Sequence, residues 1–178
     1  MTAYAVFLRG VNVGGINLKM ADVKAALSRL PVTGVSTLLA SGNAVLRSEL
    51  GAAALKEAVQ NALRESFGYD AWVIVMAADD VDATVGACPY PPDDDSTHTY
   101  VTLSTEPSVL DELWVLAAAS GTEHTRLSPV ATAWLAPVGG TLDSPMGKAT
   151  GKAKFKATTT TRNLRTMLKV QAALAKLP

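Results

Sequence analysis

The sequence has very little cysteine, histidine and charge. Its 178 residues include one cysteine, Cys88, so no disulfide can form within the chain, which is typical of cytoplasmic proteins. Two histidines, His98 and His124, stand at spacings unrelated to each other and to Cys88, so we expect no metal site and no cofactor. Only 18% of the residues are charged and 48% are hydrophobic, which predicts a globular protein with a substantial core.

Long hydrophobic runs are also absent. No stretch approaches the roughly 20 apolar residues of a membrane span. The N-terminus enters a strand pattern at Tyr4 without the basic, apolar and small-residue segments of a signal peptide. We therefore expect a cytoplasmic protein that makes no contact with a membrane.

Acidic residues are missing from residues 144–178, although the net charge of the whole chain is zero. That segment carries eight basic residues, whereas residues 70–143 carry twelve acidic residues and one basic residue. One interpretation is that the basic tail folds against the acidic middle, or that both are solvated faces. The other is that the tail supplies an anion-binding surface.

A glycine-rich turn follows the first expected strand and reads Leu8-Arg9-Gly10-Val11-Asn12-Val13-Gly14-Gly15. Three glycines in six residues permit positive φ angles and a close approach to another group, and the strand delivers Arg9 to the turn. This pattern suits an anion site and suits a tight structural turn equally well. It is not a P-loop, because Ile16-Asn17 stand where Lys and Ser/Thr are needed. It is not a Rossmann fingerprint, because Asn12 replaces the second glycine.

The first 77 residues alternate between strand and helix patterns. Strands are expected over residues 4–8, 35–40, 44–47 and 71–77, and helices over residues 20–30 and 52–67. Gly68 is placed to end the second helix, and Ser41-Gly42-Asn43 joins the second and third strands as a hairpin. The order βαββαβ predicts a ferredoxin-like α+β subdomain, with an antiparallel sheet and both helices on one face.

The open face of this predicted sheet is poor in aromatic residues. RNA-recognition motifs stack bases on such a face and need aromatic side chains on the central strands, but the third strand has none. The last strand, residues 72–77, is apolar on both faces. An exposed edge does not tolerate that pattern, so we expect the second half of the chain to pack against it.

The second half of the chain predicts a smaller α+β subdomain. Helices are expected over residues 79–87 and 109–119, and strands over residues 99–103, 125–127 and 131–136. The proline-rich loop 88–95 marks the boundary, which divides the chain into residues 1–88 and 89–178. Its three consecutive aspartates lack the spacing of a calcium loop. No internal repeat is visible in the sequence.

The final helix carries one apolar and one cationic stripe. We expect Thr161 to cap it and four apolar residues to form its buried face: Leu164, Met167, Leu168 and Leu174. The free backbone N–H groups of the first turn, the preceding threonine hydroxyls and Arg162 suit a phosphate or carboxylate. The structural alternative is a plain cap with Arg162 paired to an acidic side chain.

Three motifs together resemble those of a known family. They are the glycine-rich turn at residues 8–15, Ser41-Gly42-Asn43, and Thr161-Arg162-Asn163 followed by Thr166. In this order they resemble the bacterial family called domain of unknown function 1697. Val11 stands where that family usually has Ile, and Leu164 where an aromatic residue is common. The resemblance implies a two-part α+β fold with a ferredoxin-like first part, and it implies no activity.

Two function hypotheses follow. The first is a protein that binds a phosphate-bearing or other anionic ligand, either a small molecule or nucleic acid. The second is an enzyme that acts on a small anionic metabolite held by the same groups. No catalytic residue is assigned, because Ser41 has no histidine near it in the sequence. A structural or interaction role, marked by an exposed apolar patch, is the third alternative, and the oligomeric state is left open.

The expected ligand-binding residues come from these motifs and the lysine-rich stretch: Arg9, Gly10, Asn12, Gly14, Gly15, Ser41, Asn43, Lys152, Thr161, Arg162 and Asn163. The segments 9–15 and 161–163 each place an arginine beside backbone N–H groups, without an acidic residue within four positions. We therefore expect them to lie together as one concave anion site. In that case Arg162→Ala abolishes anion binding and costs less than about 1 kcal/mol, as expected of an exposed charge.

Overall fold

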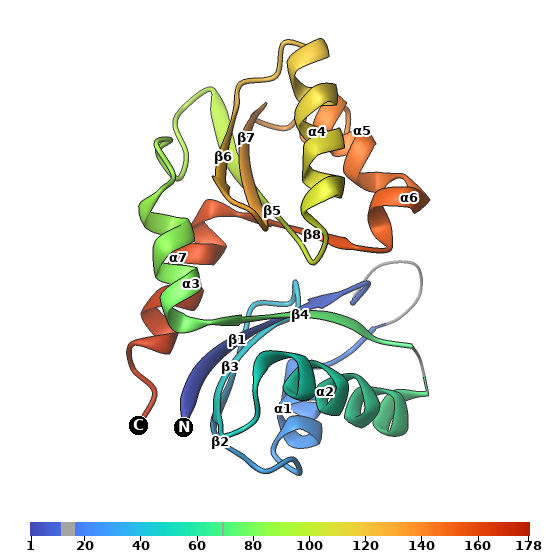
Figure 1. Ribbon diagram of the computed structural model, residues 1–178, viewed down its shortest axis with the longest axis vertical. Helices are drawn as coiled ribbons and strands as arrows, with labels where there is room; N and C mark the ends of the chain where they lie inside the picture. The colour runs from blue at the N-terminus through green and yellow to red at the C-terminus, as the bar shows by residue number, and fades with distance from the viewer. Residues whose placement is uncertain (12–16, 69) are drawn as a thin grey trace. The chain divides into compact units, whose positions relative to one another are not determined.

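Two four-stranded antiparallel sheets, each with helices against one face, make up the computed structural model (Figure 1). The structure describes residues 1–11, 17–68 and 70–178. The chain divides into two compact units, Met1–Asp82 with Lys169–Pro178, and Ala83–Leu168. The α+β class predicted from the sequence is confirmed, and a domain boundary at residue 88 stays a prediction.

The first unit contains the predicted βαββαβ succession. Its elements are β1 (Thr2–Arg9), α1 (Met20–Leu27), β2 (Val32–Leu38), β3 (Asn43–Ser48), α2 (Ala52–Phe67) and β4 (Trp72–Ala77). The strands lie in the order β2-β3-β1-β4, and all neighbours are antiparallel. Strands β2 and β3 form the predicted hairpin around Ser41 and Gly42.

Helix α2 shows how the sequence specifies this unit. Leu55, Val59 and Leu63 recur at every fourth position, lie on one face and are fully buried in the same core as alternate residues of β1. Burying each such side chain contributes about 1.5–3 kcal/mol. Gly68 ends the helix with a left-handed φ of 67°, and its N–H donates to the carbonyl of Arg64 at 2.8 Å. The predicted end of α2 is therefore confirmed.

The second unit has a sheet of the same topology. Its complete elements are β5 (Thr97–Ser104), α4 (Pro107–Ala119), β6 (His124–Ser128), β7 (Ala131–Pro137), α5 (Pro145–Gly151), α6 (Ala153–Lys156) and β8 (Thr159–Asn163). Helices α3 (Ala78–Gly86) and α7 (Leu164–Leu174) each begin in one unit and end in the other. The strand order is β6-β7-β5-β8, which repeats the order of the first sheet with β5 in the place of β1. The sequence shows no repeat, because a topology is specified by hydrophobic periods and turns rather than by residue identity.

The threonine run near the end of the chain is a strand and not the start of a helix. Residues Thr159–Asn163 pair with β5, and α7 begins at Leu164. The Asn163 side-chain oxygen accepts a hydrogen bond from the Arg165 N–H at 2.8 Å, so Asn163 is the capping residue. The predicted cap at Thr161 is wrong, because β-branched threonines favour a strand and pair with a neighbour here. The predicted buried face of α7 is confirmed at Leu164, Met167 and Leu174, whereas Leu168 is only partly buried.

The core of the second unit lies between its sheet and helices α4, α5 and α6. Trp134 is its largest fully buried side chain, and its indole N–H donates to the Thr102 hydroxyl at 2.9 Å. Tyr100 stacks on the same ring with centroids 4.9 Å apart. Throughout the described part of the chain, no helix combines the length and apolar character needed to cross a bilayer.

Candidate functional site

Arg9 is the last residue of β1, and Gly10 opens the turn with a φ of 72°. A Cβ atom at Gly10 would have no heavy atom within 4 Å, so the space beside this residue is open. The Arg9 side chain is half-buried, and this burial lowers the pKa of its guanidinium. Within residues 1–11, 17–68 and 70–178, no carboxylate or carbonyl pairs with that guanidinium.

The hairpin turn between β2 and β3 packs directly against this glycine-rich turn. The backbone N–H of Leu8 donates to the carbonyl of Gly42 at 2.8 Å. A Cβ atom at Gly42 would lie 2.4 Å from Val11 and 3.0 Å from Leu8, so only glycine fits. The structure therefore brings two of the three sequence motifs together in the first unit.

Asn43 and Ser41 have different roles in that hairpin turn. Asn43 is fully buried, and its side-chain amide donates to the Leu38 carbonyl and to the Ser41 hydroxyl, both at 3.0 Å. It fastens the turn from inside. Ser41 is exposed and accepts the bond from Asn43, which leaves its own hydroxyl proton available to a ligand.

Three of the expected ligand-binding residues, Asn12, Gly14 and Gly15, lie outside the described residues. Arg9 belongs to the first unit and the segment 161–163 to the second. That the two segments form one anion site stays a prediction.

Arg162 does not have the exposed side chain that the sequence suggested. It lies in β8 and is 7% exposed. Its guanidinium donates to the Thr160 hydroxyl at 2.8 Å and to the Thr161 carbonyl at 3.0 Å. The prediction that Arg162 is an exposed charge is therefore wrong, and the small stability cost expected of Arg162→Ala rested on that exposure.

The two remaining residues of this set lie in the second unit. The Thr161 hydroxyl is 2.9 Å from the Thr102 hydroxyl, so it joins β8 to β5 instead of capping a helix. Lys152 is exposed between α5 and α6, beside a hollow of about 450 Å³ that includes Val115 and Leu116.

A polar cluster that the sequence did not predict surrounds Asp93. One carboxylate oxygen of Asp93 is 2.5 Å from Nδ1 of His98 and 3.4 Å from the side-chain amide of Asn163. The other oxygen pairs with Arg165. Asp93 is 16% exposed, and its contacts with Asn163 and Arg165 place it beside the first turn of α7. A carboxylate of the chain itself therefore lies where a bound anion was expected.

The contact between Asp93 and His98 fixes the orientation of the imidazole. A carboxylate only accepts hydrogen bonds, so Nδ1 of His98 donates, and Nε2 is the proton acceptor of the neutral ring. This is the arrangement of a general base and its orienting group. In the described part of the chain no hydroxyl or thiol is bonded to Nε2. The only sequence signal was the position of His98 at the start of a strand that follows an aspartate-rich loop.

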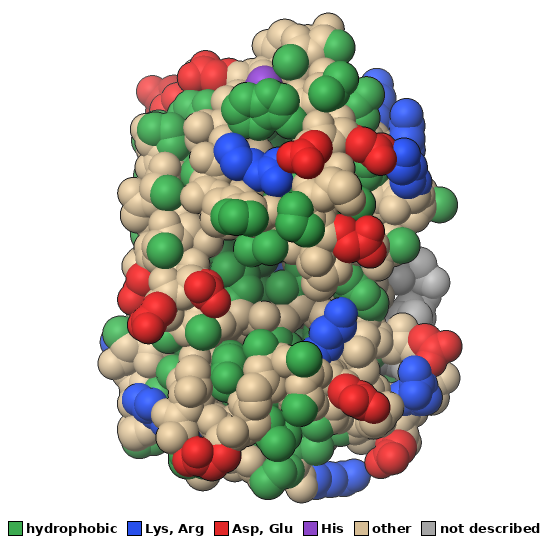
Figure 2. Space-filling model, in the orientation of Figure 1, with side chains coloured by type: hydrophobic (Ala, Val, Ile, Leu, Met, Phe, Trp, Pro, Cys, Tyr) green, Lys and Arg blue, Asp and Glu red, His purple; other side chains and the backbone are tan. Residues whose placement is uncertain are grey.

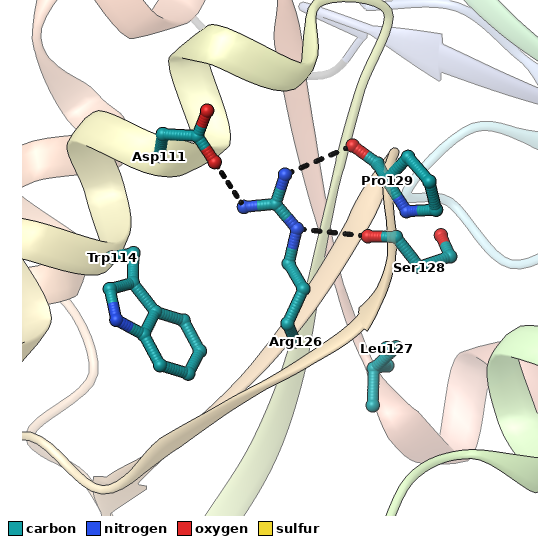
Figure 3. Close-up of a pocket in the computed structure, with 6 residues that line it drawn as sticks. All are labelled: Asp111, Trp114, Arg126, Leu127, Ser128 and Pro129. Carbon is teal, nitrogen blue, oxygen red and sulfur yellow. Dashed lines mark hydrogen bonds and ion pairs between the residues drawn. The ribbon is translucent and has the colours of Figure 1, made fainter.

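A hollow of about 670 Å³ lies between α4 and the β6–β7 turn (Figure 3). Trp114 forms one wall, and Arg126 crosses the hollow to an ion pair with Asp111 at 3.1 Å. Arg126 also donates to the carbonyls of Ser128 at 2.9 Å and Pro129 at 3.1 Å. The guanidinium therefore has its partners within the chain, which leaves Trp114 and the edge of β6 as the open features of this hollow.

Metal binding finds no support in the part of the chain that the structure describes. No three His, Cys, Asp or Glu side chains there are close enough together to hold an ion. The cluster around Asp93 contains one histidine and one carboxylate. The carboxylate already contacts the histidine and Arg165.

Comparisons with known proteins give a family and a fold. The family model "Protein of unknown function (DUF1697)" matches residues 1–130. The solved structure of conserved bacterial protein SP0830 from Streptococcus pneumoniae is similar, with a TM-score of 0.76 and 23% identity, over 97% of this chain and 98% of that chain. At this identity the likeness shows the fold alone. No curated protein matches the chain.

Proposed function

We propose an anion-binding function for this chain, which belongs to the DUF1697 family of proteins of unknown function. The ligand is phosphate-bearing or carries another compact anionic group, and it binds at the turn that begins with Arg9 and Gly10. A nucleic-acid phosphate and a small phosphorylated molecule share this chemistry.

The half-buried Arg9 guanidinium carries this proposal. Burial removes part of the water that stabilises a cation, and the lowered pKa of Arg9 reflects that cost. Buried charges in proteins are normally paired, yet the described residues offer Arg9 no counter-ion. A bound anion supplies the missing charge, and the planar guanidinium matches two phosphate oxygens.

The neighbouring turn supports the same site. Gly42 packs against Leu8 and Val11 and thereby holds both sides of Arg9 in place. Ser41 adds an exposed hydroxyl on the same hairpin turn, and the open space at Gly10 admits a ligand close to the backbone. A rigid support of this kind reduces the entropy lost on binding.

The test is thermal unfolding of the full chain with inorganic phosphate, a nucleoside monophosphate and a short oligonucleotide at low salt. A ligand that binds only the folded state raises the melting temperature. The shift should disappear in Arg9→Gln and persist in Arg29→Gln, which removes an exposed arginine of the same unit. Without ligand, Arg9→Gln should melt no lower than the wild type, because it removes a poorly solvated charge.

Two results decide against the proposal: no anion shifts the transition at low salt, or Arg9→Gln and Arg29→Gln respond alike. If the oligonucleotide is the better ligand, its affinity should fall steeply with salt, because phosphate contacts release counterions. A small phosphorylated molecule should show a much weaker salt dependence.

An enzyme acting on a small anionic metabolite is the second candidate, and the contact between Asp93 and His98 favours it. An imidazole whose Nδ1 is held by a carboxylate presents Nε2 to a substrate as a general base. A panel of phosphomonoesters and carboxylic esters tests this reading. Turnover that is lost in His98→Gln and kept in His124→Gln would support it, and turnover unchanged in both would remove it.

A further inference from the structure

Strand β6 is an open edge of the second sheet. Among the residues that the structure describes, it has a neighbouring strand, β7, on one side only. The N–H of Leu135 donates to the carbonyl of Glu123, and Thr125 opposite Ala133 is the next hydrogen-bonded position of this antiparallel pair. The backbone N–H and C=O groups of His124 and Arg126 therefore point away from β7.

These four backbone groups have no partner among the described residues. Natural proteins usually protect such an edge with proline, lysine or a covering segment, because unpaired edges recruit other strands. Neither proline nor lysine occurs between His124 and Ser128. The one charged side chain of β6, Arg126, is paired with Asp111, and the irregularity in the β6–β7 register lies beyond Arg126. The edge at His124 to Arg126 is thus available for strand pairing.

Beside this edge α4 exposes apolar side chains. Trp114 is 38% exposed and packs edge-on against His124, with ring centroids 4.2 Å apart. Figure 2 shows hydrophobic side chains at the surface over α4 and β6, with basic and acidic side chains next to them. The hollow between Trp114 and Arg126 joins this surface to the β6 edge.

The charges of this surface indicate which partner fits. Asp111 pairs with Arg126, so the two charges that line the hollow beside β6 neutralise each other. A strongly acidic or basic partner gains no net attraction there. In a two-fold symmetric dimer the same surface of both copies comes together, so a surface without net charge faces another surface without net charge.

We infer that β6 of this chain pairs antiparallel with β6 of a second copy, which joins the two four-stranded sheets into one and covers Trp114. A two-fold axis through Thr125 places His124 of one copy opposite Arg126 of the other. All four outward backbone groups of each strand then find partners. The alternative register, with Arg126 opposite Arg126, places like charges together and is disfavoured.

This register makes a geometric prediction at Thr125. Its N–H and C=O point to β7, so across the axis the two Thr125 residues form a non-hydrogen-bonded pair with Cα atoms about 4.5 Å apart. That separation falls within the range that a disulfide spans. Thr125→Cys in a Cys88→Ser background should therefore give a covalent dimer under mild oxidation. Leu142→Cys, which lies in the same unit and is 84% exposed, should not.

Light scattering on the full-length chain over a wide concentration range provides the second measurement. The mass should approach twice the 18.5 kDa of one chain and fall on dilution. Trp114→Glu should shift the equilibrium towards the monomer by at least tenfold, and Leu142→Glu should leave it unchanged. The Thr125→Cys cross-link keeps the test decisive if Trp114→Glu fails to fold.

Three outcomes overturn the inference. The first is that the chain has the mass of one copy at every concentration, which would mean that no second copy pairs with the β6 edge. A dimer forms but Thr125→Cys does not cross-link it. A folded Trp114→Glu variant dimerises as strongly as the wild type, which places the interface elsewhere.

Discussion

Gly42 lies so close to Val11 that a Cβ atom on Gly42 would be 2.4 Å from a methyl carbon of Val11. Its φ angle of 80° is also one that residues with a side chain rarely adopt. We therefore predict that Gly42→Ala destabilises the protein by about 2–4 kcal/mol, since backbone strain and a steric clash add. The free energy of unfolding in urea measures this loss.

Gly121→Ala is the matched control for that substitution. Gly121 has a φ of 67°, and a Cβ atom there would have no heavy atom within 4 Å. It should cost only the left-handed strain, about 1–2 kcal/mol. Equal losses at Gly42 and Gly121 would show that the close approach to Val11 is relieved by a small shift of the hairpin turn.

Arg162→Ala should be clearly destabilising. The side chain is 7% exposed and bonded to Thr160, so its removal leaves buried polar groups without their partner. The expected loss is about 2–3 kcal/mol. Lys152→Ala, at an exposed position, should stay within about 0.5 kcal/mol of the wild type. A similarly small loss for Arg162→Ala would show that the Arg162 side chain behaves as a solvated charge and that its bond to Thr160 contributes little.

The sequence predicted the elements whose pattern is local. Helix α2 is an example: Leu55, Val59 and Leu63 have the helical period, and Gly68 ends the helix where expected. It did not predict β8, because threonine is common both at helix caps and in strands, and only pairing with β5 decides between them. The shared topology of the two sheets was also missed, since it depends on strand order in space.

That the residues chosen from the sequence bind a ligand stays a prediction, but two of the chosen turns are neighbours in the first unit. The Arg9 turn and the Ser41-Gly42 turn were chosen from glycine patterns, and they do lie together. Arg162 was taken as exposed, because burial of a single charged residue has no sequence signature. The contact of Asp93 with Asn163 joins residues 70 positions apart, and only the fold brings them together.

Asp94 should make the stability depend on pH in acid. Hydrogen bonds from Ser96 and Thr97 to its carboxylate lower its pKa from 3.8 to about 2. The unfolded chain therefore takes up this proton first as the pH falls. The stabilising contribution is complete above about pH 4 and is lost as the pH falls through about 2.

The measurement for Asp94 is the melting temperature as a function of pH for the wild type and Asp94→Asn. The variant cannot titrate at this position, so its curve should be flatter between about pH 4 and pH 2. Asp95→Asn, an exposed neighbour, serves as the control and should follow the wild type. Parallel curves for all three proteins would mean that the hydrogen bonds to Asp94 do not persist in solution.

Trp134 and Thr102 should be energetically coupled. The indole N–H donates to the Thr102 hydroxyl inside the core of the second unit. Thr102→Val leaves that donor buried and unpaired, which costs about 1–3 kcal/mol. In a Trp134→Phe background the same change should cost less, because the indole donor is gone and only the bond between the Thr102 and Thr161 hydroxyls is lost. A double-mutant cycle by urea unfolding measures the difference, and simple additivity would contradict the contact.

Asp93 should be the residue on which the start of α7 depends. Its carboxylate accepts from His98 and Asn163 and pairs with Arg165, so Asp93→Ala removes the common partner of three donors. The free energy of unfolding should fall by about 1.5–3 kcal/mol. The pair with Arg165 should contribute little of this, because the Arg165 side chain is exposed to solvent.

Asp95→Ala, in the same loop, should change the stability by less than about 0.5 kcal/mol, because Asp95 is exposed. A second measurement separates the orienting role of Asp93 from plain packing. The nitrogen chemical shifts of His98 report which ring nitrogen carries the proton, and in the wild type this should be Nδ1, because only Nδ1 faces the carboxylate. Asp93→Ala should release the ring to a mixture of tautomers, while Asp95→Ala should not. If His98 keeps one tautomer without Asp93, another group orients the imidazole, and the general-base reading loses the contact on which it rests.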